Sequence, residues 1–244
     1  MEAPQMKQFE MLATRLADTA ADSVMNRGAE EAALESHLLA LKDRLRSIER
    51  AGTDQRALAD VRLQMARTLV SLDRGEEAWP LGRAAFDQFI ALHDFELAAD
   101  ACDVLFQSEQ PDSIAALGQG IWLAVTCPID PELTIELLSH VIDETPDDAD
   151  GAAVAATTAL FLADVRAQGR HRDDLMFFAT QMLATVARRH SAVETPEQLD
   201  LWMDRLELKE PEKFLVRLRN VVDVLVQDDW WFDREALQDR LPLA

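Results

Sequence analysis

Apolar residues repeat at helical spacing along most of the chain. One set is separated by steps of four, three, four and three residues, which places its members on one face of a helix: Leu34, Leu38, Leu41, Leu45 and Ile48. The same pattern recurs over residues 58–72 and 214–225. No segment shows the sustained alternation of β-branched residues that is typical of strands. The sequence therefore predicts an all-α fold.

Glycine and proline residues indicate where these helices begin and end. Four glycines follow periodic segments, as residues that terminate helices do: Gly28, Gly52, Gly75 and Gly169. The segment from Thr195 to Gln198 has the residues of a capping box, with proline at the first helical position. Asp130-Pro131 and Glu210-Pro211 predict two further helix starts. The expected helices cover residues 5–26, 30–50, 54–73, 76–91, 94–108, 112–126, 131–144, 149–168, 172–190, 196–208, 211–227 and 233–240.

Part of this pattern resembles a known helical repeat. Met65, Ala66 and Leu69 have the large, small and large side chains of the first helix of a tetratricopeptide repeat, and Ala78 and Ala85 match small positions of the second. With a similar match at Thr134, Leu138, Val141 and Pro146, the resemblance covers residues 54–168. It implies stacked helical hairpins that bind a peptide or protein on a concave face.

Three regions follow from these patterns. We expect an N-terminal helical hairpin over residues 1–52, a tetratricopeptide-like region with an acidic middle over 53–195, and a C-terminal helical cap over 196–244. Short connectors make neighbouring helices antiparallel. The predicted architecture is antiparallel hairpins stacked as a tetratricopeptide-like solenoid, and the alternative is a compact α-helical bundle.

The charge of the chain is strongly negative and unevenly distributed. The formal net charge is −21, and no lysine or arginine occurs between Arg83 and Arg166. That interval holds sixteen acidic residues, so the rest of the chain has a net charge of only −5. Such a surface repels phosphate and attracts basic surfaces, which argues against direct binding of nucleic acid or of an anionic membrane. The alternative explanation is that the acidity serves solubility.

The usual catalytic motifs are absent from the sequence. There is no phosphate-binding loop, HExxH, GxSxG or CxxC motif, so we expect neither an enzyme nor a cofactor. Helix packing explains the lone Gly118-Gln119-Gly120 segment better than a nucleotide site does. Cys102 and Cys127 lie in apolar segments and predict no disulfide framework. With no secretory signal and no apolar run of about 18 residues, we expect a cytoplasmic protein of bacterial type with no membrane association.

One group of residues suggests an alternative function. Glu136, His140 and Glu144 follow one another at four-residue steps and share a helix face, so they are candidate ligands of a helical-bundle metal protein or enzyme. Cys127 and His140 are a weaker candidate pair of nucleophile and base, because no third group is evident.

The residues expected to bind a partner are acidic or aromatic. Trp230, Trp231 and Phe232 are consecutive, and we expect them to cap the end of the helical stack while leaving one ring for a partner. The candidate acidic residues are Glu136, Asp143, Asp147, Asp148 and Asp150.

The preferred function is a non-catalytic adaptor, assembly factor or dedicated chaperone. It would bind a basic protein partner through its acidic helical surface and a C-terminal aromatic anchor. A further alternative is an acidic mimic of nucleic acid. A homodimer is also conceivable, because a basic island follows the acidic middle: Arg166, Arg170, His171, Arg172, Arg188 and Arg189.

Overall fold

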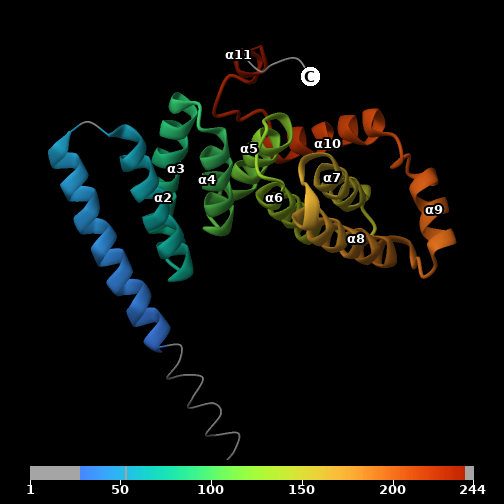
Figure 1. Ribbon diagram of the computed structural model, residues 1–244, viewed down its shortest axis with the longest axis horizontal. Coiled ribbons are helices and arrows are strands. Elements are labelled where there is room, and N and C mark those ends of the chain that lie inside the picture. Colours follow the sequence, from blue (N-terminus) through green and yellow to red (C-terminus); the bar gives the residue numbers. More distant parts are fainter. Residues whose placement is uncertain (1–27, 53, 240–244) are drawn as a thin grey trace, which may run out of the picture.

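The computed structural model describes residues 28–52 and 54–239, and these residues form helices and no strands (Figure 1). This confirms the predicted all-α fold. A helix over residues 28–51 comes first, and the expected helix over 5–26 lies outside the described residues. The labelled helices are α2 (Gln55–Ser71), α3 (Gly75–Leu92), α4 (Phe95–Gln107), α5 (Ser113–Thr126), α6 (Pro131–Glu144), α7 (Asp150–Arg166), α8 (Gly169–Ser191), α9 (Pro196–Arg205), α10 (Pro211–Val226) and α11 (Arg234–Gln238).

Most helix starts agree with the sequence. Pro131 and Pro211 are the first residues of α6 and α10, and the predicted capping box precedes α9. The prediction that glycines end helices was wrong at Gly75 and Gly169, which are the first residues of α3 and α8, and Gly28 is itself helical. A Cβ atom at Gly75 would lie 1.9 Å from the carbonyl oxygen of Ser108, so the start of α3 needs glycine because it lies directly against the end of α4.

The helices are stacked in chain order. Each helix from α2 to α8 packs against the next, and α2 also contacts α4, as α6 contacts α8. These neighbours are those of stacked antiparallel hairpins. After α9 the chain turns back, and α10 packs against α5 and α7 (Figure 1). The C-terminal region therefore covers one side of the stack.

The centre of the stack is built from small side chains. Helix α7 contacts α6, α8 and α10, and it is buried on nearly all sides. A helix in such a position needs apolar residues all round. Its alanines are buried, which allows close packing of its neighbours: Ala152, Ala155, Ala156 and Ala159.

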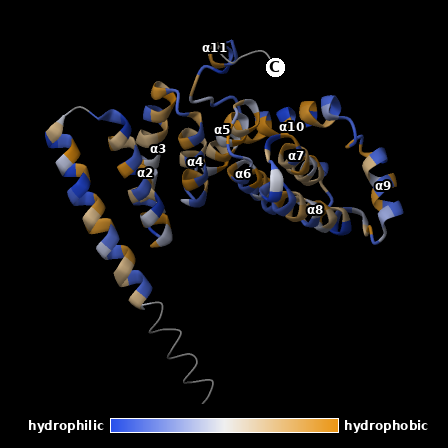
Figure 2. Cartoon of the chain, in the orientation of Figure 1, coloured by the Kyte–Doolittle hydropathy of each residue, from blue (hydrophilic) through white to orange (hydrophobic). Residues whose placement is uncertain are grey.

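The helix over residues 28–51 uses its predicted stripe to join the stack. Leu38 and Leu41 are buried, and the other three members of the stripe are half-buried. Glu35 forms an ion pair with Arg74 at 2.9 Å, at the start of α3. Figure 2 shows the resulting mixture of hydrophobic and hydrophilic residues along this outer helix.

The Gly118-Gln119-Gly120 segment lies where α5 meets its neighbours most closely. A Cβ atom at Gly118 would lie 2.6 Å from Cγ2 of Val226 in α10. A Cβ atom at Gly120 would lie 2.8 Å from Cβ of Cys102 in α4. Both glycines therefore permit close helix packing, which confirms the structural interpretation of this segment.

Candidate functional site

The acidic residues without an ion pair gather around α6. Of the sixteen acids between Arg83 and Arg166, seven form ion pairs with described residues: Asp87, Asp94, Asp100, Asp103, Asp147, Asp150 and Asp164. The other nine form none with the described part of the chain: Glu96, Glu109, Asp112, Asp130, Glu132, Glu136, Asp143, Glu144 and Asp148. Five of these nine lie in α6 or in the turn after it.

Three of these acids form a stripe along α6. Glu132, Glu136 and Asp143 are spaced by four and seven residues, so they lie on one face of the helix, and all three are exposed. We call these three residues the α6 stripe. It presents negative charge to solvent, and no basic residue of the described chain neutralises it by direct contact.

A buried acid lies behind the α6 stripe. Asp103 in α4 is only 1% exposed, and its Oδ1 lies 2.8 Å from Nε2 of His140. Gln107 donates to Oδ2 of the same carboxylate at 2.5 Å, and the His140 ring lies 4.6 Å from the ring of Phe106. A buried carboxylate requires such partners, because an isolated charge is strongly unfavourable away from water. His140 therefore faces inward and stabilises the α4–α6 contact.

The position of Glu136 beside α4 raises the pKa of its carboxyl. Partial burial raises the pKa of this carboxyl, and the neighbouring charges of Asp103 and Asp100 raise it further. His140 and Arg67 act in the opposite direction but do not cancel the shift. The raised pKa therefore reflects burial first and the negative charge of the nearby acids second.

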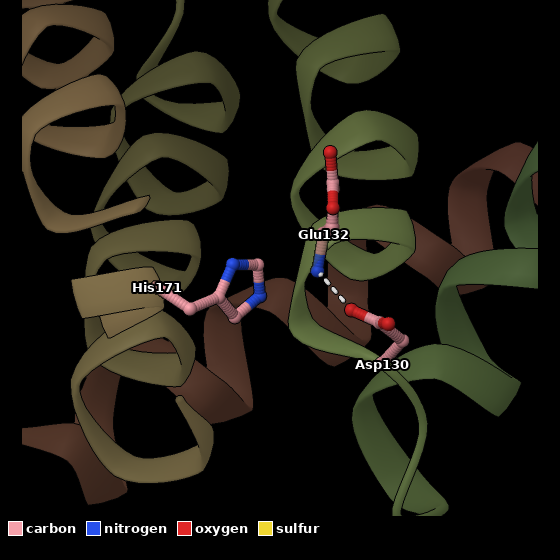
Figure 3. Close-up of side chains that lie close together, drawn as sticks. All are labelled: Asp130, Glu132 and His171. Carbon is pink, nitrogen blue, oxygen red and sulfur yellow. Dashed lines mark hydrogen bonds between the residues drawn. The ribbon is translucent and has the colours of Figure 1, made fainter. Parts of the chain in front are cut away.

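The predicted metal ligands do not come together. His140 is engaged by Asp103, and Glu144 borders a groove beside α10 instead of facing Glu136. Within the described residues, the ligand atoms that lie within 4.8 Å of one another belong to Asp130, Glu132 and His171 (Figure 3).

The group in Figure 3 brings His171 of α8 close to the start of α6, a proximity that the sequence alone did not indicate. The Asp130 carboxylate accepts a hydrogen bond from the backbone N–H of Glu132 at 2.8 Å, so it caps α6. All three side chains are exposed. We therefore assign Asp130 a role in starting α6, whereas the Glu132 carboxylate stays exposed as part of the α6 stripe.

The C-terminal aromatic residues lie across the side of the stack. The ring of Trp231 lies 6.2 Å from that of Trp79 and 5.3 Å from that of Phe86, both in α3. Phe232 lies 5.3 Å from Trp122 in α5. The prediction that these residues cap the end of the stack was wrong, because they cover α3 and α5 instead; we call them the aromatic cap. This correction arises because α10 turns back along the stack and carries the following segment with it.

Each of the three aromatic rings contacts other side chains of the chain. All are half-buried, and two are covered by guanidinium groups: Arg83 lies 4.1 Å from the ring centroid of Trp231, and Arg234 lies 3.7 Å from that of Trp230. Sequence reasoning missed Gln119, whose side chain donates to the carbonyl oxygen of Asp229 at 2.8 Å and so holds this segment in place. A lone glutamine in the apolar sequence of α5 was the signal, because a buried amide needs hydrogen-bond partners.

Two arginines of the basic island, Arg166 and Arg189, serve the fold. Arg166 donates to the carbonyl oxygens of Ala124 and Val125 at 2.6 and 2.7 Å, at the end of α5. Arg189 donates to the carbonyl oxygen of Ile142 at 2.6 Å, at the end of α6. Each guanidinium satisfies carbonyl groups that have no partner inside their own helix.

The predicted acids at the start of α7 differ in their surroundings. Asp150 contacts Arg217 at 2.7 Å and His190 at 3.2 Å, so it belongs to a network that holds α7, α8 and α10 together. Asp147 contacts Arg189 at 3.8 Å but its side chain is 80% exposed. Asp148 is exposed and forms no ion pair with a described residue. Asp147 and Asp148 therefore remain accessible, and Asp150 is structural.

The two cysteines are buried free thiols. Burial raises the pKa of Cys127 to about 11, and it also raises the pKa of the fully buried Cys102. Because His140 is paired with Asp103, the proposed pair of Cys127 and His140 is not formed.

Comparison with known proteins identifies no relative. No protein-family model, curated protein or solved structure matches the chain. Within the described residues, no helix has both the length and the apolar character that crossing a membrane requires.

Proposed function

We propose that the chain is a non-catalytic binding scaffold, of the adaptor, assembly-factor or dedicated-chaperone kind, for a basic protein partner. The proposal depends on one observation: the exposed acids of the α6 stripe form no ion pair with the described residues. A basic partner would neutralise these charges and would be attracted over a distance comparable to the Debye length.

The surrounding structure supports this proposal. The stripe lies on a helix held between α5 and α7, and its inner side is ordered by the contact between Asp103 and His140. A rigid surface binds with less loss of conformational entropy than a flexible one. The half-buried residues Trp230, Trp231 and Phe232 remain the predicted aromatic anchor, although their internal contacts leave only part of each ring accessible.

A charge-neutralised variant tests the proposal. We would use the full chain as bait in native lysate and compare it with Glu132→Gln, Glu136→Gln and Asp143→Asn combined. The matched control combines Asp174→Asn, Glu194→Gln and Glu212→Gln, which changes the charge equally at exposed sites outside the stripe. We expect basic proteins to be retained by the wild type and the control, to be lost by the stripe variant, and to elute with salt. Equal retention by all three chains would contradict the proposal.

The same acids are also compatible with mimicry of nucleic acid. This second function predicts that duplex DNA displaces the captured partner from the α6 stripe, because both would occupy one basic site. A homodimer through the basic residues of α8 is a separate proposal. It predicts a sedimentation coefficient that falls as the salt concentration rises.

A further inference from the structure

An apolar groove lies between α10 and the turn that joins α6 to α7. Its volume is about 450 Å³, and its lining includes Ile114, Val141, Glu144, Val221, Val224 and Leu225. We call it the α10 groove. Its volume is within the range of about 300–1,000 Å³ that is typical of binding pockets.

The groove is lined by a face of α10 that the fold covers only in part, because Val221 and Leu225 are half-buried against the core. Leu218, Val222 and Val226 point into the core, where α10 packs against α5 and α7. Val224 instead is 71% exposed, and Ile114 on the opposite wall is 37% exposed. Neighbouring exposed apolar residues indicate an interaction surface. Because these residues lie at the surface and not in an enclosed cavity, the occupant must cover them from outside, as a segment of a macromolecule does.

The charges around the groove define the chemistry of that segment. Glu144 lines the groove, and Asp112 directly precedes the α5 turn that contributes Ile114. Asp147 and Asp148 lie in the turn between two further lining residues, Thr145 and Ala149. Among the described residues that line the groove, none is lysine or arginine. Arg189 of α8 caps α6 and lies 3.8 Å from Asp147, but the Asp147 side chain is still 80% exposed.

We propose that the α10 groove binds an amphipathic helix of a protein partner, with an apolar face against Val224 and Val221 and basic side chains toward Glu144 and Asp147. Binding of an amphipathic helix in a groove needs apolar side chains spaced by three or four residues on the partner helix. The basic side chains of the partner helix are complementary to the acidic residues around the groove. These acidic residues therefore select a cationic helix over an anionic one. The inference rests on the proposed function. It adds an apolar contact site for the basic partner that is separate from the α6 stripe.

Two exposed valines on α10 provide a matched test. Val224 lines the groove, whereas Val216 is 59% exposed on the same helix and does not line it. Val224→Asp and Val216→Asp add the same charge to the same helix. An added negative charge alone would favour a cationic ligand, so a loss of affinity in Val224→Asp reports the apolar contact.

The probe is a fluorescein-labelled helical peptide of about 16 residues with a leucine face and a lysine face. Two further peptides replace either the lysines with glutamates or the leucines with alanines. We expect fluorescence anisotropy to show that the full chain binds the leucine–lysine peptide and that both replacement peptides bind at least about tenfold more weakly. We also expect Val224→Asp to weaken binding at least about tenfold and Val216→Asp to leave it within about twofold. Circular dichroism and thermal unfolding check that both variants are folded.

The possible results separate the two proposals. Equal binding of the leucine–lysine peptide by Val224→Asp and wild type would overturn the groove assignment. Equal binding of the lysine and glutamate peptides would overturn the basic partner of the groove. The absence of binding by the leucine–lysine peptide would overturn the groove assignment. In these cases the α6 stripe variant still tests the proposed function in lysate. Conversely, retention of basic proteins by the stripe variant contradicts the proposed function but not the peptide result.

Discussion

The side chain of Gln119 in α5 holds the backbone of the C-terminal segment at Asp229. Its Nε2 donates to the carbonyl oxygen of Asp229 at 2.8 Å, across 110 residues of sequence. Its Oε1 lies 3.4 Å from the backbone nitrogen of Trp231, which donates to it. Since the amide is fully buried, both of its polar ends are satisfied by this one segment.

Removal of this amide should loosen the aromatic cap. In Gln119→Leu, the carbonyl of Asp229 loses its partner, and we expect the free energy of unfolding to fall by about 1–3 kcal/mol. Urea unfolding measures the loss, and tryptophan emission should shift to the red as Trp230 and Trp231 become more exposed. Gln181→Leu, at an exposed position of α8, is the control and should change neither quantity appreciably. An unchanged emission spectrum in Gln119→Leu would show that the cap is held by the aromatic contacts alone.

The close approach of α10 to α5 depends on Gly118. In Gly118→Ala, the new Cβ would lie 2.6 Å from Cγ2 of Val226 and 3.1 Å from Cβ of Leu225, so α10 must move outward. We expect destabilisation by about 1–3 kcal/mol from overpacking, although alanine gains up to about 1 kcal/mol in helix propensity.

A second glycine provides the control for this substitution. In Gly151→Ala, the nearest atom would lie 3.7 Å away, which is an ordinary contact, so we expect a neutral or slightly stabilising change. Val226→Ala removes the obstructing methyl group and should reduce the cost of Gly118→Ala in a double-mutant cycle. Equal unfolding midpoints for the two single glycine variants would show that α10 is not tightly packed at Gly118.

The raised pKa of Glu136 makes stability depend on pH. The folded chain binds this proton more tightly than the unfolded chain, so ionisation of Glu136 lowers the free energy of unfolding as pH rises through its pKa. Glu136→Gln should therefore be more stable than wild type at neutral pH. Because the side chain is exposed, the difference should be below about 1 kcal/mol. It should disappear below about pH 4, where the carboxyl is protonated in both states. Urea titrations across this pH range measure the effect, and a destabilised Glu136→Gln at neutral pH would contradict it.

The buried thiols should be unreactive until the chain unfolds. With its pKa near 11, Cys127 at pH 8 is thiolate in only about one molecule in a thousand. Cys102 is fully buried and its pKa is also raised. We expect a disulfide reagent to modify neither thiol in the native chain at pH 8 and both in concentrated urea. Rapid modification of one thiol in the native chain would indicate an accessible, activated cysteine and would favour a catalytic role.

Features that depend on neighbours in sequence were predictable. The proline starts of α6 and α10 and the capping box before α9 depend on a few consecutive residues, and all three are present. Gly75 was misjudged because its need for glycine comes from Ser108, which lies in another hairpin. The tetratricopeptide resemblance stays a prediction, since stacked hairpins are common to several all-α architectures.

The candidate site was predictable in composition but not in arrangement. The helical spacing of Glu132, Glu136 and Asp143 places them on one face whatever the tertiary structure. The same spacing suggested that His140 shares a ligand set with Glu136, but the structure pairs it with Asp103 from the preceding hairpin.

By itself, the sequence of this protein determined the helices, most of their ends and the excess of acid in its middle third, because each depends on periodicity, capping or composition. Only the tertiary structure decided which acids are neutralised, that α10 returns to cover α5 and α7, and that Trp230, Trp231 and Phe232 rest on the side of the stack. The physical reason is that ion pairs, close helix crossings and aromatic contacts join residues far apart in the chain, and one buried glutamine or glycine can determine where such segments meet.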